Sequence, residues 1–428
     1  MSWIRRRPLA ALVVLALALR VACAVVTEYK PIFPAYYYTD ATLTHDYALS
    51  ALKDIREGRA PLINGTLGER VQTLTSLEIY RMLGPRPFAL KLLNALLGAL
   101  AVAAFAWAMS IIFPTRAALI AGLALAVWPS HIFYTSQNLK EAPIGLLTYA
   151  AFGAVFAAGF GEGVSRARAA SLAAAAGFAL LGAGFYRSYV LVAAGGTLLA
   201  ALALSALRPP RTNALLAAAA LVAALAFYPA ASGRLLAAFD SRALGEADSN
   251  RTVSRLIPVT YDNADPRLIY RPTSPEGLSR FRTARQSADR RWALINAHRD
   301  IGSQLYPDET FKTWLDVLLY LPKGAFTVLF MPLPGLSPLE GKLGRYAASG
   351  ENLALLALAA LAAAGILRGR KSAARLGLIA FFAVMTVGAA LLEFDLGSAG
   401  RHKLLYLPML FPFAAEEALR LLRVKESE

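Results

Sequence analysis

The sequence predicts an all-α protein that crosses a membrane about ten times. Of its 428 residues, 57 % are hydrophobic and 17 % are charged, and the mean hydropathy is +0.48. Soluble globular chains are more charged and less apolar than this. Apolar runs of about 20 residues, the length with which a helix crosses a bilayer core, recur along the whole chain, and short loops rich in Arg and Lys separate many of them.

Ten apolar runs are long enough to be spans. They are residues 8–26, 88–112, 117–133, 142–160, 169–186, 189–207, 214–231, 351–367, 376–393 and 403–420. Another apolar stretch, 311–336, is interrupted by prolines, and counting it as a span would move the basic cluster 368–375 to the outer side. We therefore interpret 311–336 as an interfacial or re-entrant segment.

The basic residues of the short loops predict the orientation, because Arg and Lys near span ends stay on the cytoplasmic side. They all fall on one side of this assignment: Arg5–Arg7, Arg116, Arg166, Arg168, Arg208, Arg211, Arg368, Arg370, Lys371, Arg375, Arg420, Arg423 and Lys425. Both termini are therefore predicted to be cytoplasmic. The net charge of +16 follows mostly from this orientation, so it does not predict a nucleic-acid partner.

The spans divide the chain into three parts. Residues 1–231 form an N-terminal transmembrane module whose first outer loop is 27–87, residues 232–350 form a long extra-cytoplasmic loop that includes the interfacial segment, and residues 351–428 form the C-terminal transmembrane helices.

The first outer loop is predicted to contain two amphipathic helices. Apolar residues recur at helical spacing from Tyr47 to Ile55, and Gly58 is a typical helix stop. A second stretch, TLTSLEIYRMLG, ends at Gly84 and Pro85. Amphipathic helices of this kind lie along a membrane surface.

Several motifs resemble one enzyme family. Acidic residues precede a Tyr-x-x-x-Ala pattern in the first outer loop, followed by LTSLEIYRMLGPRPFALKLLNALLGALAV and, after a Pro-ended span, by YTSQNLKEAPIGLL. These residues resemble the polyprenyl-phosphate-dependent glycosyltransferases of the GT-C fold, within them most closely the bacterial relatives of the protein mannosyltransferases. The tail GSAGRHKLLYLPMLFPFAAEEAL is similar to the family's R-x-x-L-P-x-x-P pattern. The resemblance covers residues 10–160 well, the tail moderately and the middle poorly.

The resemblance implies a GT-C-like bundle and a reaction outside the cytoplasm. Members of this family take a sugar from a lipid-phosphate donor and pass it to a hydroxyl of a lipid, glycan or protein. An acidic residue of the first outer loop is their base, and basic residues bind the donor phosphate. The implied location is the inner membrane of a bacterium, and the implied partners are the polyprenyl-phosphate sugar, its acceptor and membrane lipids.

The chemistry of glycosyl transfer requires the same two kinds of group, an acidic residue and basic residues. Inverting glycosyl transfer needs a carboxylate to accept the proton of the acceptor hydroxyl and cations where phosphate charge develops. Asp40 and Asp46 lie in the first outer loop, and Glu141 begins the fourth span. The family's acid stands four residues before the Tyr, a place that Leu43 holds before Tyr47.

Asp40 and Asp46 therefore both stay candidates for the base. Asp40 is favoured because Arg70 then stands at a plausible separation, where relatives carry Lys. Glu141 is predicted to orient the acceptor, or to bind a divalent cation together with Asp40, since oxygen-ligand metal sites need two or more converging carboxylates. The simpler interpretation of Glu141 is compensation of a helix dipole. No other cofactor is predicted.

The candidate donor-phosphate ligands are basic residues on the predicted outer face. They are Arg70, Lys140, Arg187, Arg401, His402 and Lys403. Arg187 stands in a very short loop where a guanidinium can bind a lipid phosphate through two hydrogen bonds, although snorkelling to headgroups is the simpler interpretation. Residues 401–403 are basic on the outer side, against the usual bias.

Two other functions stay open. An O-antigen ligase or polymerase also has many spans and a long Arg-rich outer loop, which here would place function at Arg282, Arg285, Arg290 and Arg291. A lipid or glycan transporter would line a path with charges, but transporters often show internal repeats and this sequence shows none.

Overall fold

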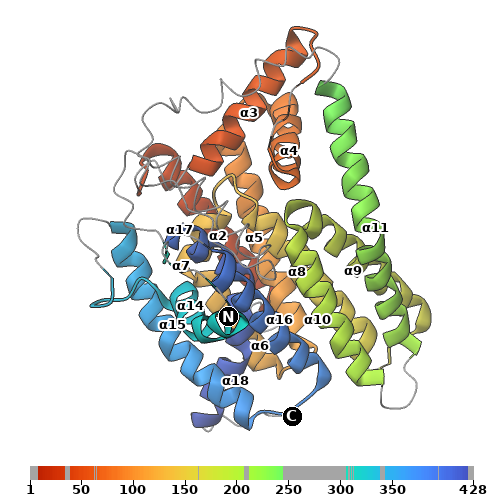
Figure 1. Ribbon diagram of the computed structural model, residues 1–428, viewed down its shortest axis with the longest axis vertical. Coiled ribbons are helices and arrows are strands. Elements are labelled where there is room, and N and C mark those ends of the chain that lie inside the picture. The colour runs from red at the N-terminus through yellow and green to blue at the C-terminus, as the bar shows by residue number, and fades with distance from the viewer. Residues whose placement is uncertain are drawn as a thin grey trace. The chain divides into compact units, whose positions relative to one another are not determined.

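The computed structural model confirms the all-α class (Figure 1), and no β-strand occurs among the residues it describes. Those residues are 8–33, 39–61, 63, 65–161, 163–206, 212–243, 305–306, 309, 311, 313–337, 343–393 and 395–422. The arginines at 282, 285, 290 and 291 lie outside them.

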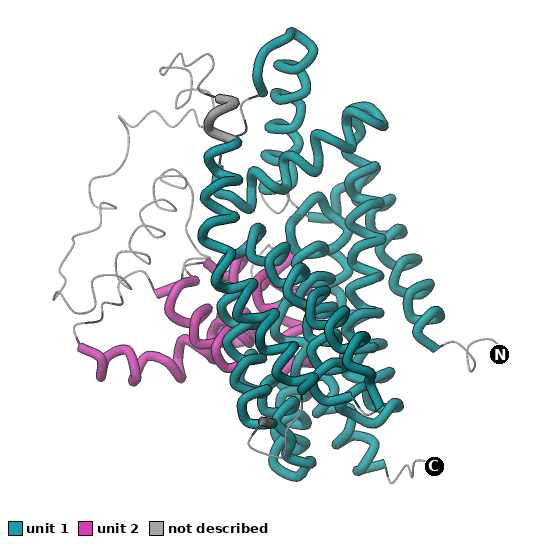
Figure 2. Tube along the Cα trace, turned by 90° about the vertical axis from the view of Figure 1, so that its right-hand side faces the viewer, with its two compact units in different colours: residues 1–245, 356–382, 404–428 teal, residues 246–355, 383–403 magenta. Residues whose placement is uncertain are grey.

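The chain forms two compact units (Figure 2). Unit 1 is residues 1–245, 356–382 and 404–428, and unit 2 is residues 246–355 and 383–403. The two amphipathic helices of the first outer loop and all helices up to residue 243 belong to unit 1.

Hydropathy predicts most of the spans correctly. Eight described helices are long and apolar enough to cross a membrane. They are α2 (Pro8–Tyr29), α5 (Pro87–Ser110), α8 (Glu141–Phe160), α9 (Arg166–Tyr186), α10 (Ser188–Ala206), α11 (Thr212–Ala243), α15 (Leu343–Arg368) and α16 (Ala373–Leu392). A ninth span is counted if one bent pair, α6 (Thr115–Val127) and α7 (Pro129–Thr135), is a single crossing.

The bend between α6 and α7 corrects the predicted continuous span 117–133. The two helices meet at 62°, and Trp128 between them is extended, with φ −65° and ψ 118°. Pro129 has no N–H to donate to the preceding turn, and its ring disfavours helical backbone at the residue before it. The chain therefore turns at this point and starts a new short helix.

The predicted span 403–420 is also not one helix. It comprises the end of α17 (Leu396–Tyr406), a 3-10 turn η6 (Leu407–Leu410) and most of α18 (Phe411–Leu421). Pro408 and Pro412 each stand at the start of one of the last two elements, where a missing N–H is tolerated. The described part of the chain therefore has eight or nine candidate spans in place of the predicted ten.

Arg20 of α2 stabilises the bend between α6 and α7. Its side chain is fully buried, and it donates from Nε to Thr135 Oγ1 at 2.9 Å and from Nη1 to the Ala126 carbonyl at 3.3 Å. Nη2 lies 2.5 Å from His131 Nδ1. The guanidinium thus contacts both arms of the bend and supplies a donor to a carbonyl at the end of α6, where the helical ladder is interrupted.

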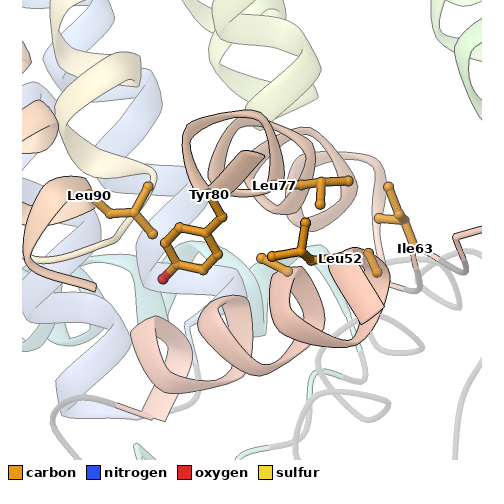
Figure 3. Close-up of a cluster of buried hydrophobic side chains, with 7 residues drawn as sticks. Leu52, Ile63, Leu77, Tyr80 and Leu90 are labelled. Atoms are coloured by element: carbon orange, nitrogen blue, oxygen red, sulfur yellow. The ribbon is translucent and has the colours of Figure 1, made fainter. Parts of the chain in front are cut away.

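The two predicted amphipathic helices are α3 (Thr39–Arg56) and α4 (Leu67–Leu83), and they pack side by side. Figure 3 shows the apolar cluster between them, to which Leu52, Ile63, Leu77 and Tyr80 contribute together with Leu90 of α5. The cluster buries the apolar face of both helices and attaches them to a span.

The ends of α3 and α4 have clear local causes. In α4, the backbone N–H and the hydroxyl of Thr66 both donate to the Glu69 carboxylate, which satisfies groups at the start of the helix. Gly84 ends α4 with a positive φ of 80°, and Gly58 follows α3 with a φ of 72°, both conformations that glycine adopts easily. The two predicted helix stops are therefore confirmed.

Two long-range hydrogen bonds join segments near the predicted cytoplasmic basic residues of unit 1. Arg375 donates to the carbonyl of Ile112 at 3.3 Å, and Asn213 donates to the carbonyl of Val164 at 2.9 Å. These contacts join the start of α16 to the loop before α6, and the start of α11 to the loop before α9. The side of the membrane on which these segments lie stays a prediction.

Unit 2 contains α14 (Trp314–Phe330), which lies within the segment predicted to be interfacial. One face of α14 exposes Trp314, Leu315, Leu318 and Leu319, whereas Val317, Tyr320 and Thr327 are buried. α14 is not among the candidate spans of the described chain.

Replacing Arg20 with Met tests its role at the bend. The substitution keeps an apolar stem and removes the donors, so the Ala126 carbonyl and His131 lose a buried partner. We expect the free energy of unfolding to fall by about 3 kcal/mol, measured by thermal unfolding in detergent. Arg166→Met at the exposed start of α9 is the control and should unfold like the wild type. Equal melting temperatures for both variants would show that Arg20 is not a stabilising residue.

Candidate functional site

A buried ion pair joins two of the residues predicted from the sequence. Arg187 Nη2 lies 2.6 Å from Glu141 Oε1, and the two side chains are 9 % and 7 % exposed. Glu141 is the first residue of α8, and Arg187 is the single residue between α9 and α10. The dipole of α8 favours the carboxylate at its N-terminus, whereas the dipoles of α9 and α10 act on the guanidinium in opposite directions, because Arg187 follows one helix and precedes the other.

Lys140 stands next to this pair at the N-cap of α8. Burial lowers the pKa of Lys140 below the ordinary lysine value, and the positive charge of Arg187 lowers it further. Three carboxylates, those of Glu69, Glu141 and Asp40, act in the opposite direction. Four charged groups from four parts of unit 1 therefore act on one ammonium group.

This charged cluster is composed of Asp40, Glu69, Lys140, Glu141 and Arg187, and four of its five members were predicted from the sequence. Glu69 was missed. The Thr-x-x-Glu spacing at 66–69 is a capping-box signal, which would have placed a carboxylate at the start of the second amphipathic helix.

The structure distinguishes the two aspartates proposed as base. Asp40 lies in the first turn of α3 and is among the charges that act on Lys140. Asp46 is exposed on the same helix and acts instead on Tyr47 and Tyr80. Burial is the main cause of the raised pKa of both tyrosines, and the negative charge of Asp46 is a smaller one.

Arg70 is next to Glu69 on α4, and its Nε donates to the Gly65 carbonyl at 2.9 Å. This bond holds the side chain against the loop that precedes its own helix. The assignment of Arg70 to the donor phosphate stays a prediction.

The basic residues 401–403 belong to unit 2 and are described within it. His402 Nδ1 contacts the Glu393 carboxylate. Lys403 is 3 % exposed, and its Nζ donates to the carbonyl of Leu329 at 2.7 Å and to Asn352 Oδ1 at 2.6 Å. Burial lowers the pKa of Lys403 to about 8, against a smaller opposite effect of Glu351.

The predicted divalent-cation site at Asp40 and Glu141 has few ligands around it. The described residues contain no group of three or more His, Cys, Asp or Glu side chains placed to hold a metal ion. Glu141 is engaged by Arg187. We therefore assign no chemical step to a metal.

The chain is similar in fold to solved structures of two membrane enzymes. The archaeal oligosaccharyltransferase AglB from Archaeoglobus fulgidus, in complex with an inhibitory peptide and a dolichol-phosphate, aligns with 100 % of this chain and 53 % of its own at 14 % identity and a TM-score of 0.49. The apo form of the oligosaccharyltransferase from the same organism aligns with 99 % of this chain and 52 % of its own at 14 % identity and a TM-score of 0.48.

ArnT from Cupriavidus metallidurans, bound to undecaprenyl phosphate, aligns with 94 % of this chain and 77 % of its own at 14 % identity and a TM-score of 0.37. AglB and ArnT are both glycosyltransferases of the GT-C fold. At 14 % identity and TM-scores below 0.5, the alignments assign no activity to this chain. The chain spans about half the length of AglB. No protein-family model and no curated protein sequence matches it.

A double-mutant cycle tests the ion pair. Arg187→Gln should lower the free energy of unfolding by about 3 kcal/mol, because it leaves the Glu141 carboxylate buried without its guanidinium. The same substitution should cost clearly less in a Glu141→Gln background, measured by thermal unfolding in detergent. The exposed pair Arg81–Glu78, with atoms 3.0 Å apart, is the control, and Arg81→Gln should cost less than about 1 kcal/mol. Equal costs in both backgrounds would mean that the pair is not coupled.

Proposed function

We propose that this chain is a membrane glycosyltransferase that takes a sugar from a polyprenyl-phosphate donor. It passes the sugar, with inversion, to a hydroxyl of a lipid, glycan or protein acceptor at the cell envelope. The observation that carries the proposal is the charged cluster: the Arg187–Glu141 ion pair lies where α9 ends and α8 begins, next to Lys140, and the carboxylates of Asp40 and Glu69 act on the charge of that lysine. The motifs that resemble GT-C enzymes lie in the same segments.

The cations of the cluster suit a phosphate leaving group. As the glycosidic bond breaks, negative charge grows on the phosphate, and preorganised positive groups stabilise it. Glu141 fixes the orientation of the Arg187 guanidinium through the 2.6 Å contact, and Lys140 places an ammonium group next to it. Their low exposure strengthens the interaction with an anion, because little water screens it.

Asp40 is the best candidate for the base. It lies in the first turn of an amphipathic helix, close enough to Lys140 to affect its charge, and it is exposed. An acceptor hydroxyl can therefore reach the carboxylate beside the bound donor, which is what proton transfer during attack requires. Asp46 acts on the two tyrosines instead, so it ranks second.

The remaining predicted ligands have supporting roles in this proposal. Arg70 and the basic residues 401–403 are proposed to contact the donor phosphate. Lys403 is the weakest of these candidates, because its ammonium group is buried against a carbonyl and an amide oxygen.

The proposed location is the inner membrane of a bacterium, with both termini in the cytoplasm. The basic residues of the short loops support this orientation, and two hydrogen bonds between segments predicted to be cytoplasmic are consistent with it. The charged cluster is then on the extra-cytoplasmic side, at the opposite ends of α8 and α9.

Single substitutions of the acidic residues test the roles. In proteoliposomes supplied with a radiolabelled polyprenyl-phosphate sugar, Asp40→Asn should reduce transfer about 100-fold or more, the usual contribution of a general base. Asp46→Asn should retain most of the activity, and Glu141→Gln should weaken donor binding because Arg187 loses its partner. If Asp40→Asn keeps full activity and Asp46→Asn loses it, Asp46 would be assigned as the base instead. Full activity in all three variants would overturn the site.

Lipid analysis of a deletion strain separates the proposal from its alternatives. A transferase should leave an accumulated polyprenyl-phosphate monosaccharide and a glycan that lacks one residue, both visible by mass spectrometry. Accumulation of a complete oligosaccharide on its carrier would support a ligase or polymerase. Movement of a lipid-linked sugar across proteoliposomes without a glycosidic product would support a transporter.

A further inference from the structure

The five residues before Lys140 are buried although four of them are polar. Thr135, Ser136, Gln137, Asn138 and Leu139 are each at most 5 % exposed. They connect the short helix α7 to the start of α8. Buried polar groups are costly unless they are hydrogen-bonded, so their partners determine where this loop can lie.

Those partners come from two neighbouring helices. Gln72 Nε2 of α4 donates to Asn138 Oδ1 at 2.8 Å, and Asn138 Nδ2 lies 3.4 Å from Ser76 Oγ of the same helix. On the other side, Gln137 Nε2 donates to Thr27 Oγ1 of α2 at 3.1 Å. The loop is thus tied to a span and to an amphipathic helix.

The same side of α4 also contacts the end of α9. A Cβ atom at Gly68 would lie 2.1 Å from the carbonyl oxygen of Tyr186, so only glycine permits this approach. The side chains of Thr75 and Tyr186 share a hydrogen bond. Tyr186 directly precedes Arg187 in the chain.

We propose that one stripe of α4 is the positioning element of the charged cluster, and that Gln72 and Asn138 are its central pair. The stripe is Gly68, Gln72, Thr75 and Ser76, whose spacings of three and four residues place them on one helix face. Gly68 and Thr75 contact the residue before Arg187, whereas Gln72 and Ser76 contact the loop that ends at Lys140. One rigid helix face therefore sets where Arg187 stands relative to Lys140 and Glu141.

The inference deepens the proposed function, because it names residues that hold the site without touching the substrate. It is tested through Lys140, because the charges of Arg187, Glu69, Glu141 and Asp40 all affect its ammonium group. If α4 maintains that arrangement, disturbing the Gln72–Asn138 bond should change the pH at which Lys140 becomes reactive. This readout does not depend on catalysis.

The experiment labels the full-length protein in detergent with a water-soluble acylating reagent over a range of pH. The labelling rate of the Lys140 peptide is followed by mass spectrometry, with the exposed Lys53 as the internal reference. The variants are Gln72→Leu, Asn138→Leu and the double variant. Thr73→Val is the matched control, because Thr73 is buried on the same helix and its hydroxyl has no hydrogen-bond partner.

In the wild type, Lys140 should become reactive at a lower pH than an ordinary lysine side chain, because burial lowers the pKa of its amine. Gln72→Leu and Asn138→Leu should each raise the Lys140 midpoint by about half a pH unit, roughly a threefold slower labelling at a fixed pH below it. The double variant should add little to the larger single effect, and Thr73→Val should leave the midpoint unchanged. If the Leu variants do not fold, Gln72→Asn makes the same test, because its shorter amide no longer reaches Asn138.

A fall in melting temperature with an unchanged Lys140 midpoint would overturn the proposal and leave Gln72 and Asn138 as ordinary core residues. If the variants shift the Lys140 midpoint but the wild-type protein itself transfers no sugar, the positioning role is retained and the proposed function is rejected. Shifted midpoints together with a lower kcat for transfer would support both.

Discussion

The arrangement of unit 1 depends on a guanidinium buried in the middle of its first span. Membrane interiors supply no water to satisfy backbone groups, so an interrupted helix there needs a protein partner. Arg20 is that partner for the bend between α6 and α7. Because the bend sends α7 into the polar loop 135–139, and that loop ends at Lys140, the position of the charged cluster follows from a contact more than a hundred residues away in the sequence.

The sequence predicts the class and most spans because hydropathy is a local property. It does not predict which proline interrupts a helix. Pro229 lies inside the continuous helix α11, whereas Pro129 follows a bend of 62°. The difference depends on what surrounds each proline, and Arg20 stabilises the bend at Pro129 from another helix. In the segment 403–420, Pro408 and Pro412 each stand at the start of a new element.

The charged cluster is predictable in part for similar reasons. Lys140, Glu141 and Arg187 stand at span boundaries, where an ionisable residue is conspicuous in the sequence. Gln72 and Asn138 are not conspicuous, because an amide in an amphipathic helix or a loop is usually solvated. Their pairing across 66 residues is visible only once the helices pack. The rank of Asp40 above Asp46 likewise comes from which neighbours each carboxylate acts on.

Arg187 is the entire connection between α9 and α10. Its backbone N–H donates to the carbonyl of Ala183 at 2.9 Å. The connection between the two helices therefore contains no additional residue that could absorb a change in length. Inserting a residue here would rotate α10 about its axis by about 100° and would carry the guanidinium away from Glu141. Related chains should therefore vary in length at other loops while this junction keeps its length. Such an insertion would leave the hydrophobicity of both spans unchanged, and its effect would be to separate Arg187 from Glu141.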